Sequence, residues 1–216
     1  MDKLPIFSDE GIYIHWARIA WHDASWRFIS LTDGRQPLQT WGTIPFLKLF
    51  PQNLLFGGRM FSVATGFISL VGLFSLLFYI FGKKTAFWGI FLYIFTPFFL
   101  FYDRIALADS AVNAGFIWIL FFSILVIRTL RFDLTLLFGI TAGMAMLTKS
   151  SVRLFIMLSA FAPILIWNRK FGKNIISKTI NYFILFILVF AIAMVLYNIQ
   201  RLSPFMHYIE LKNNTF

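Results

Sequence analysis

Two short segments of the sequence place carboxylates where they could take part in chemistry. One is the adjacent pair Asp9-Glu10, and the other runs from Asp103 to Asp109 between two hydrophobic stretches. Carboxylates at the head of a membrane helix are costly unless they are paired or face a water-filled cavity. In such a cavity a carboxylate can act as a general base that takes a proton from a hydroxyl. The candidate catalytic residues are therefore Asp9, Glu10 and Asp109, with Asp9 as the base.

Three basic side chains could work beside these carboxylates. Negative charge develops on the phosphate when a group leaves a phosphate-linked donor, and cations stabilise that charge. An arginine can also bind phosphate through two parallel hydrogen bonds. We expect Arg35, Arg104 and Lys149 to hold such a phosphate. A base together with these cations would suit the transfer of a sugar from a phosphate donor to a hydroxyl.

All of these residues except Arg35 also have a simpler structural interpretation. Acids such as Asp9-Glu10 are typical of the first turn of a helix. The pair Asp103-Arg104 could be an interfacial charge pair, and Asp109 could cap a helix that begins at Ser110. The Lys149 side chain could extend to the lipid headgroups. Structural roles therefore stay open for these candidates.

The composition indicates a membrane protein. The chain is 59% hydrophobic and 13% charged, about half of the roughly 25% charged residues of globular proteins. Cysteine is absent, which excludes disulfides and thiolate catalysis. The net charge is +10. In a membrane protein, an excess of Lys and Arg is expected in cytoplasmic loops and near anionic lipid. No basic segment alternates with exposed aromatics, so we expect no nucleic-acid partner.

The sequence predicts no cofactor with certainty. His15 and His22 are seven residues apart on one helix face, but a zinc site needs three or four ligands. Two acidic segments are compatible with a bound divalent cation and do not require one. We therefore assign no metal ligands and leave a divalent cation as an open expectation.

Six hydrophobic runs predict an all-α polytopic membrane protein with about six transmembrane helices. The first and last have about 21 residues, enough to cross a hydrocarbon core of roughly 30 Å. The fourth and fifth are shorter and predict a helical hairpin whose tip is Lys149-Ser150-Ser151. The runs are 61–81, 86–102, 111–127, 134–148, 152–167 and 179–199.

Residues 1–58 predict two amphipathic helices that lie on the membrane surface. Ser8 can cap the first helix, and Pro37 can start the second. The two helices contain several Trp and Tyr residues, which suit the membrane interface. In the first helix, we expect one face to bury Ile12, Tyr13, Trp16, Ala17, Ala20 and Trp21, while His15, Arg18 and His22 lie on another.

The distribution of charge predicts the topology. The connecting loops Gly82–Thr85, Arg128–Asp133 and Asn168–Lys178 hold eight basic residues and one acidic residue, so we expect them to be cytoplasmic. The expected organisation is an outer segment at 1–58, a transmembrane region at 59–200 and the start of another outer segment at 201–216. Because an outer N-terminal segment without a signal needs an upstream span, we expect the chain to be the N-terminal half of a longer protein.

Several motifs resemble membrane glycosyltransferases of the GT-C fold. They are Ser8-Asp9-Glu10 with Tyr13, the segment from Gly34 to Trp41, Arg59 opening a span, Arg104 to Asp109, and Leu147-Thr148-Lys149-Ser150. Their order and spacing resemble the protein O-mannosyltransferases and the lipid A aminoarabinose transferases. In these families an Asp-Glu pair follows the first membrane helix, and an Arg and a later Asp of the second outer loop face the active site. The resemblance favours Asp9 over Glu10 as the base.

The resemblance implies an inverting transferase that uses a sugar linked to polyprenyl or dolichyl phosphate. The acceptor would be a hydroxyl of a protein, lipid or glycan on the outer side of the bilayer, in a bacterial or archaeal membrane in preference to the endoplasmic reticulum. Three positions depart from the family pattern. Ile12 replaces an Arg, Gln36 replaces a Pro, and Arg35 stands where Lys is common.

Two other functions fit a chain of this composition. A transporter could also carry charges in outer vestibules, but transporters usually show repeats and broken helices at the midplane. No such repeat is present, and the acids here lie at expected helix ends. A membrane scaffold without catalysis is the third possibility. Transfer of radiolabelled sugar from polyprenyl phosphate would separate these three functions.

Overall fold

The computed structural model describes residues 5–28, 36–165 and 175–205, which form helices joined by short turns and contain no strand. This confirms the all-α membrane fold. The α-helices are α1 (Ser8–His22), α2 (Leu38–Leu49), α3 (Leu54–Phe81), α4 (Lys83–Phe95), α5 (Pro97–Tyr102), α6 (Asp109–Thr129), α7 (Phe132–Met146), α8 (Val152–Ser159), α9 (Ala162–Leu165) and α10 (Ile175–Tyr197). The described residues also contain two 3-10 helices, η1 (Ala24–Trp26) and η3 (Asn198–Leu202).

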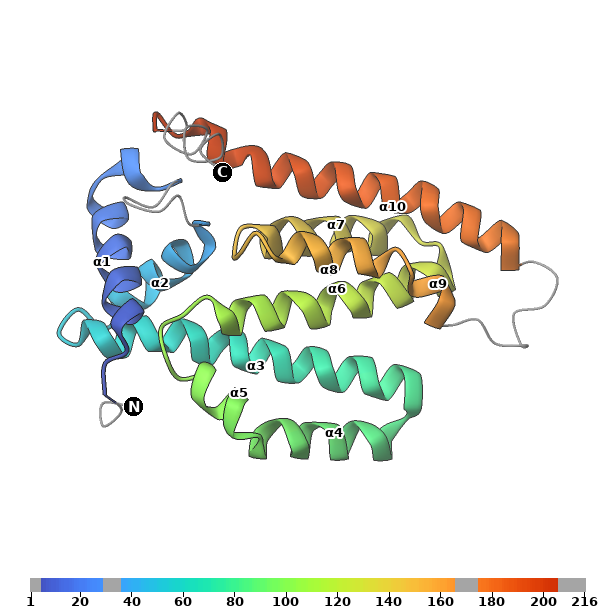
Figure 1. The fold of residues 1–216 in the computed structure, drawn as a ribbon, viewed down its shortest axis with the longest axis horizontal. Coiled ribbons are helices and arrows are strands. Elements are labelled where there is room, and N and C mark those ends of the chain that lie inside the picture. The colour runs from blue at the N-terminus through green and yellow to red at the C-terminus, as the bar shows by residue number, and fades with distance from the viewer. Residues whose placement is uncertain (1–4, 29–35, 166–174, 206–216) are drawn as a thin grey trace.

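Five helices form a row in the order α4, α3, α6, α7, α10, in which each helix contacts the next (Figure 1). Small residues allow the closest contacts. A side chain at Gly139 or Gly143 of α7 would meet Ile192 or Leu196 of α10 at 2.7–2.8 Å. Close backbone approach at Gly-x-x-x-Gly is a common way to pack helices in a membrane. α8 packs on α6 and α7 beside this row.

The six hydrophobic runs all fall on helices, but not all on single helices. Within the described part of the chain, three stretches are long and apolar enough to cross a membrane: α3, α6 and Ile176–Leu202. The run 86–102 is divided between α4 and α5 at Thr96 because Pro97 has no backbone N–H to continue the first helix. The run 152–167 is divided between α8 and α9. The structure therefore confirms helices at the described residues of these runs. It gives three stretches of membrane-spanning length there, and not six separate spans.

The two helices predicted before residue 58 are present as α1 and α2, and they cross one end of the row (Figure 1). Two details of α1 differ from the prediction. Phe7 is the N-cap and Ser8 lies inside the first turn. Ile14 is buried while Ile12 is 37% exposed, because Ile14 fits against the bare backbone of Gly58 in α3, where a Cβ would lie 2.5 Å from it.

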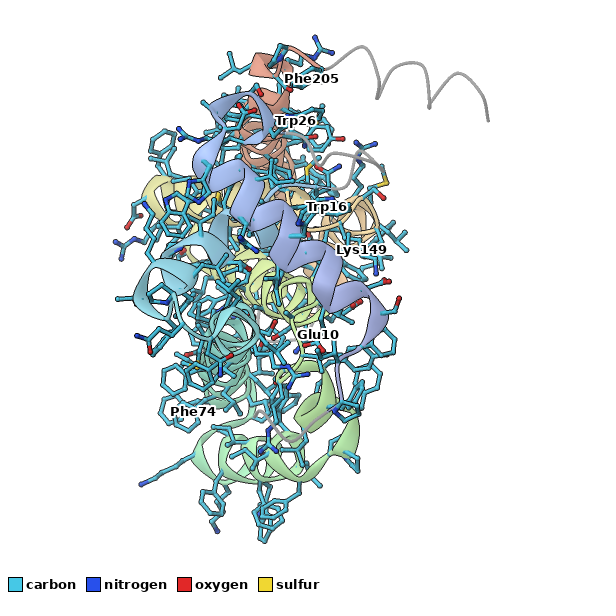
Figure 2. All side chains as sticks on the ribbon, turned by 90° about the vertical axis from the view of Figure 1, so that its left-hand side faces the viewer. Glu10, Trp16, Trp26, Phe74, Lys149 and Phe205 are labelled. Carbon is cyan, nitrogen blue, oxygen red and sulfur yellow. The ribbon has the colours of Figure 1, made fainter. Side chains whose placement is uncertain are left out.

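The two ends of the row carry different kinds of connection. α1, α2, residues 103–108 and the turn between α7 and α8 lie at one end (Figure 1). The turns from α3 to α4 and from α6 to α7 lie at the other end. Figure 2 views the first end and shows Glu10 and Lys149 there, with Trp26 of η1 beside Phe205. These two rings stack at 4.1 Å between centroids. The candidate acids and the two predicted cytoplasmic loops that the structure describes, Gly82–Thr85 and Arg128–Asp133, are therefore at opposite ends, whereas most of the third loop, Asn168–Lys178, lies outside the described residues.

Candidate active site

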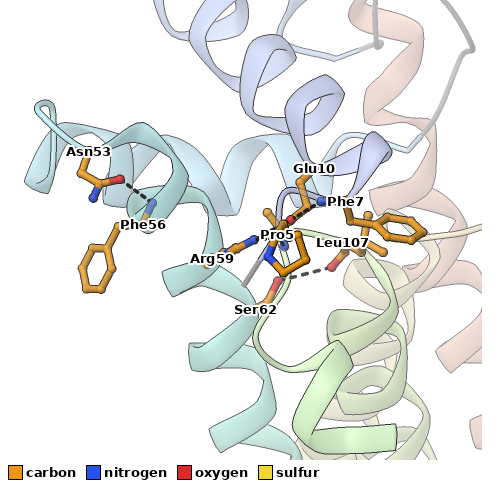
Figure 3. A network of polar contacts seen from close by, with 9 residues as sticks. Pro5, Phe7, Glu10, Asn53, Phe56, Arg59, Ser62 and Leu107 are labelled. Atoms are coloured by element: carbon orange, nitrogen blue, oxygen red, sulfur yellow. Dashed lines mark hydrogen bonds and ion pairs between the residues drawn. The ribbon is translucent and has the colours of Figure 1, made fainter. Parts of the chain in front are cut away.

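The first turn of α1 places Glu10 in a buried ion pair (Figure 3). Its partner is Arg59, one turn into α3, and both side chains are fully buried. Nε and Nη2 of Arg59 donate to Oε1 and Oε2 of Glu10, each at 2.8 Å. A bidentate pair of this kind has strong and directional hydrogen bonds. It joins the surface helix α1 to the apolar helix α3.

Two backbone groups complete the surroundings of the Glu10 carboxylate. The N–H of Phe7 donates to Oε2 at 2.9 Å, and the N–H of Ala106 donates to Oε1 at 2.8 Å. Burial by itself would raise the pKa of Glu10, but the hydrogen bonds from Arg59, Phe7 and Ala106 together lower it. An ionised carboxylate has about four acceptor sites, and four donors occupy them here. Glu10 is thus built as an anchor that holds the Arg59 cation.

Asp9 precedes this anchor and has a different environment. Its side chain is half-buried, whereas that of Glu10 is fully buried. Neighbouring residues of a helix point about 100° apart, so Asp9 does not share the pocket of the Glu10 carboxylate. The hydrogen bonds to the Glu10 carboxylate therefore fix the turn that bears Asp9. The Asp9 carboxylate is not one of the groups bound to Glu10.

Asp109 and Lys149 meet at the same end of the bundle. Nζ of Lys149 lies 3.1 Å from Oδ1 of Asp109, and the two side chains are 53% and 40% exposed. α6 begins at Asp109 itself, after Ala108 as N-cap and without a side-chain cap bond. Asp109 is therefore not the cap that the simpler interpretation suggested. An exposed ion pair contributes only about 0–1 kcal/mol, so Lys149 can exchange this partner for a ligand.

The segment between Asp103 and Asp109 is held firmly from two sides. Asp103 accepts hydrogen bonds from Tyr93 of α4 at 2.9 Å and from Ser110 of α6 at 2.7 Å. The segment's middle, Ile105–Ala108, is buried and packs against Tyr13 and Trp16 of α1. Burial raises the pKa of Asp103 in spite of these two hydrogen bonds. The interpretation of Asp103 and Arg104 as an ion pair is wrong, since Asp103 is paired with hydroxyls.

A second polar group near Lys149 was not among the predicted site residues. The Arg153 guanidinium lies 4.7 Å from the Tyr197 ring centre, and its Nη2 donates to the Tyr197 hydroxyl at 2.5 Å. Gln36, just before α2, donates to the same hydroxyl at 3.5 Å and accepts from Gln200. The sequence alone could not reveal this contact, because Tyr197 lies 44 residues after Arg153 in the chain. Arg59 was noted only as opening a span, although a lone arginine in an apolar helix signals a buried acid partner.

The predicted site residues thus fall into three sets. Glu10 and Lys149 lie at one end of the bundle (Figure 2), with Asp9 beside Glu10 in the first turn of α1 and Asp109 paired with Lys149. Arg104 is exposed and lines a separate cavity, and Arg35 lies outside the described residues. Among the residues that the structure describes, no three His, Cys, Asp or Glu side chains are placed to share a metal ion.

Apolar helices that gather carboxylates and a lysine at one end define an integral membrane protein with a group of polar side chains at that end. Residues 35–197 match the family model described as dolichyl-phosphate-mannose-protein mannosyltransferase. The match covers well over half of the chain, so the chain belongs to this family of GT-C glycosyltransferases. It includes Asp109 and Lys149, while Asp9 and Glu10 precede it. No curated protein and no solved structure gives a significant match.

Proposed function

We propose that the chain forms the base and the donor-phosphate site of an inverting transferase that moves a sugar from a polyprenyl or dolichyl phosphate to a hydroxyl outside the membrane. One observation carries this proposal. The Glu10 carboxylate binds both Arg59 and the backbone of Ala106, so the turn that bears Asp9 is joined to the segment that leads to Asp109. The description of the family supports mannose as the sugar and a protein hydroxyl as the acceptor.

The proposed reaction assigns one step to each side chain. Asp9 takes the proton of the acceptor hydroxyl while its oxygen attacks the anomeric carbon. The bond from that carbon to the phosphate oxygen breaks on the opposite face, which inverts the configuration and releases polyprenyl phosphate. Lys149 leaves Asp109 to stabilise the charge on the departing phosphate. Asp109 is the second carboxylate of the proposed site, and Arg35 is a further phosphate ligand.

We expect Lys149→Gln to weaken donor binding while the fold stays intact. Loss of a hydrogen bond to a charged group costs about 1.5–3 kcal/mol, which is a tenfold or greater rise in Kd for a polyprenyl-phosphate sugar. Titration of the purified full-length protein with that donor measures the effect. Lys84→Gln removes an exposed cation from α4 at the other end of the bundle and serves as the matched control. Equal Kd values for the two variants would remove Lys149 from the site.

The proposed sidedness can be tested by labelling. The chain has no cysteine, so single substitutions give clean signals. We expect an impermeant thiol reagent added outside intact cells to label His15→Cys, on the exposed face of α1, and not Lys84→Cys, next to the α3–α4 turn. Permeabilised cells should label both. The reverse pattern in intact cells would overturn the topology and place the site on the inner side.

A further inference from the structure

A cavity of about 330 Å³ lies between α3, α4 and α5, at the edge of the helix row. Most of its wall is apolar and includes Phe67 and Leu70 of α3, Ile94 of α4 and Leu100 of α5. Small-molecule pockets start at about 300 Å³, so the cavity can accept part of an apolar chain. Its shape depends on the break at Thr96, which turns α5 away from the line of α4.

This cavity opens to the region where the protein meets lipid. Phe67 is 66% exposed, Ile94 43% and Leu100 37%. α4 is the last helix of the row, with no further helix of the described chain on its outer side (Figure 1). Large apolar side chains exposed on a membrane helix contact acyl chains. An apolar chain from the bilayer can therefore enter the cavity without crossing water.

The end of the cavity nearest α1 is polar and carries one carboxylate and one guanidinium. Arg104 and Asp103 line it. The Asp103 carboxylate already accepts from Tyr93 and Ser110, and Asn113 donates to the Tyr93 hydroxyl at 3.0 Å. Arg104 is exposed and forms no ion pair with any described residue. The Arg104 guanidinium is thus complementary to an anion, while the Asp103 carboxylate beside it is already bound by two hydroxyls.

The cavity is distinct from the candidate active site. None of Asp9, Glu10, Asp109 and Lys149 lines it. The buried stretch Ile105–Ala108 separates Arg104 from Asp109 along the chain and packs against α1. A donor held at this cavity would therefore be separated by a packed segment from the acid pair that the proposed reaction uses.

We propose that the cavity binds one acyl chain of an anionic membrane phospholipid and that Arg104 holds its phosphate. A guanidinium is the side chain best suited to bind phosphate through two hydrogen bonds. The bound lipid would join α5 and the Arg104 end of residues 103–109 to α3. Because it binds the folded state, it would also stabilise that state by mass action.

Native mass spectrometry of the full-length protein, titrated with phosphatidylglycerol, tests this site. Arg104→Gln removes the charge, and Val63→Phe narrows the cavity from α3. We expect each variant to weaken binding about tenfold or more. Lys84→Gln and Leu92→Trp are the matched controls, because Lys84 and Leu92 are exposed on α4 outside the lining, and they should bind as the unchanged protein does. Thermal unfolding confirms that all four variants are folded.

Competition identifies the source of the bound phosphate. We expect phosphatidylcholine to bind more weakly than phosphatidylglycerol, and polyprenyl phosphate to leave bound phosphatidylglycerol in place. Displacement by polyprenyl phosphate at the same concentration would show that the cavity belongs to the donor and would overturn the proposal. Unchanged phosphatidylglycerol binding in folded Arg104→Gln or Val63→Phe would overturn it as well. Neither result depends on whether Asp9 is the catalytic base.

Discussion

Asp9→Asn is expected to abolish sugar transfer while the donor still binds. Loss of a general base typically lowers the rate by about 10²–10⁴, and the amide cannot accept the acceptor's proton. The half-buried Asp9 side chain supplies none of the four donors to the Glu10 carboxylate, and Asn has nearly the same shape as Asp, so the Glu10 anchor should survive. Transfer of radiolabelled sugar from polyprenyl phosphate, measured with membranes that contain the full-length protein, gives the rate.

Asp23→Asn is the matched control for this variant. Asp23 is an exposed acid at the other end of α1, where it accepts hydrogen bonds from Ser25 at 2.9 and 2.6 Å. Its loss removes the same charge from the same helix without touching the site, and the rate should stay close to that of the unchanged protein. Near-normal turnover in Asp9→Asn would mean that the Asp-Glu pair only starts a helix, and the mechanism would fail.

Arg59→Met is expected to destabilise the protein by about 3–5 kcal/mol, because it leaves the Glu10 carboxylate buried with half of its donors. Unfolding by heat or denaturant in a fixed detergent measures the loss. The double variant Glu10→Gln with Arg59→Met should lose less than the sum of the two single variants, since no charge is then left buried.

An exposed ion pair of the same chain provides the comparison. Arg131 and Asp133 contact each other at 2.6 Å with 64% and 58% exposed side chains. Arg131→Met should therefore cost less than about 1 kcal/mol. If Arg59→Met and Arg131→Met changed stability equally, the buried pair would not be the anchor that we describe.

Lowering the pH should weaken the ion pair between Glu10 and Arg59. The pKa of Glu10 is lowered in the folded protein from an ordinary value of 4.5. The contribution of the Glu10–Arg59 pair to the free energy of unfolding is thus complete at pH values above 4.5. It is lost as the pH falls through the lower pKa that Glu10 has in the folded protein. Over that range, unfolding of the unchanged protein should depend more strongly on pH than unfolding of Glu10→Gln.

Local patterns of the sequence determined much of this fold. Apolar runs near membrane length must form helices, because only internal hydrogen bonds satisfy a backbone surrounded by lipid. For the same kind of local reason, the acids at Asp9-Glu10 and the proline at 37 indicated α1 and α2. Pro97 is a local feature of the same kind, and it accounts for the division of the run 86–102 between α4 and α5, which the prediction of a single run did not include.

The partners of the polar side chains were decided only by the tertiary structure. Glu10 meets Arg59 across 49 residues and the N–H of Ala106 across 96. Hydropathy and helical period describe one segment at a time, whereas these contacts depend on which helix faces meet. That choice rests on packing details such as Gly58, where α3 leaves room for Ile14, and Gly66, where a Cβ would lie 2.6 Å from the Asp103 carboxylate carbon. The sequence thus indicated which residues could do chemistry, and packing decided that Glu10 is an anchor, that Asp109 pairs with Lys149, and that Arg104 lines a cavity of its own.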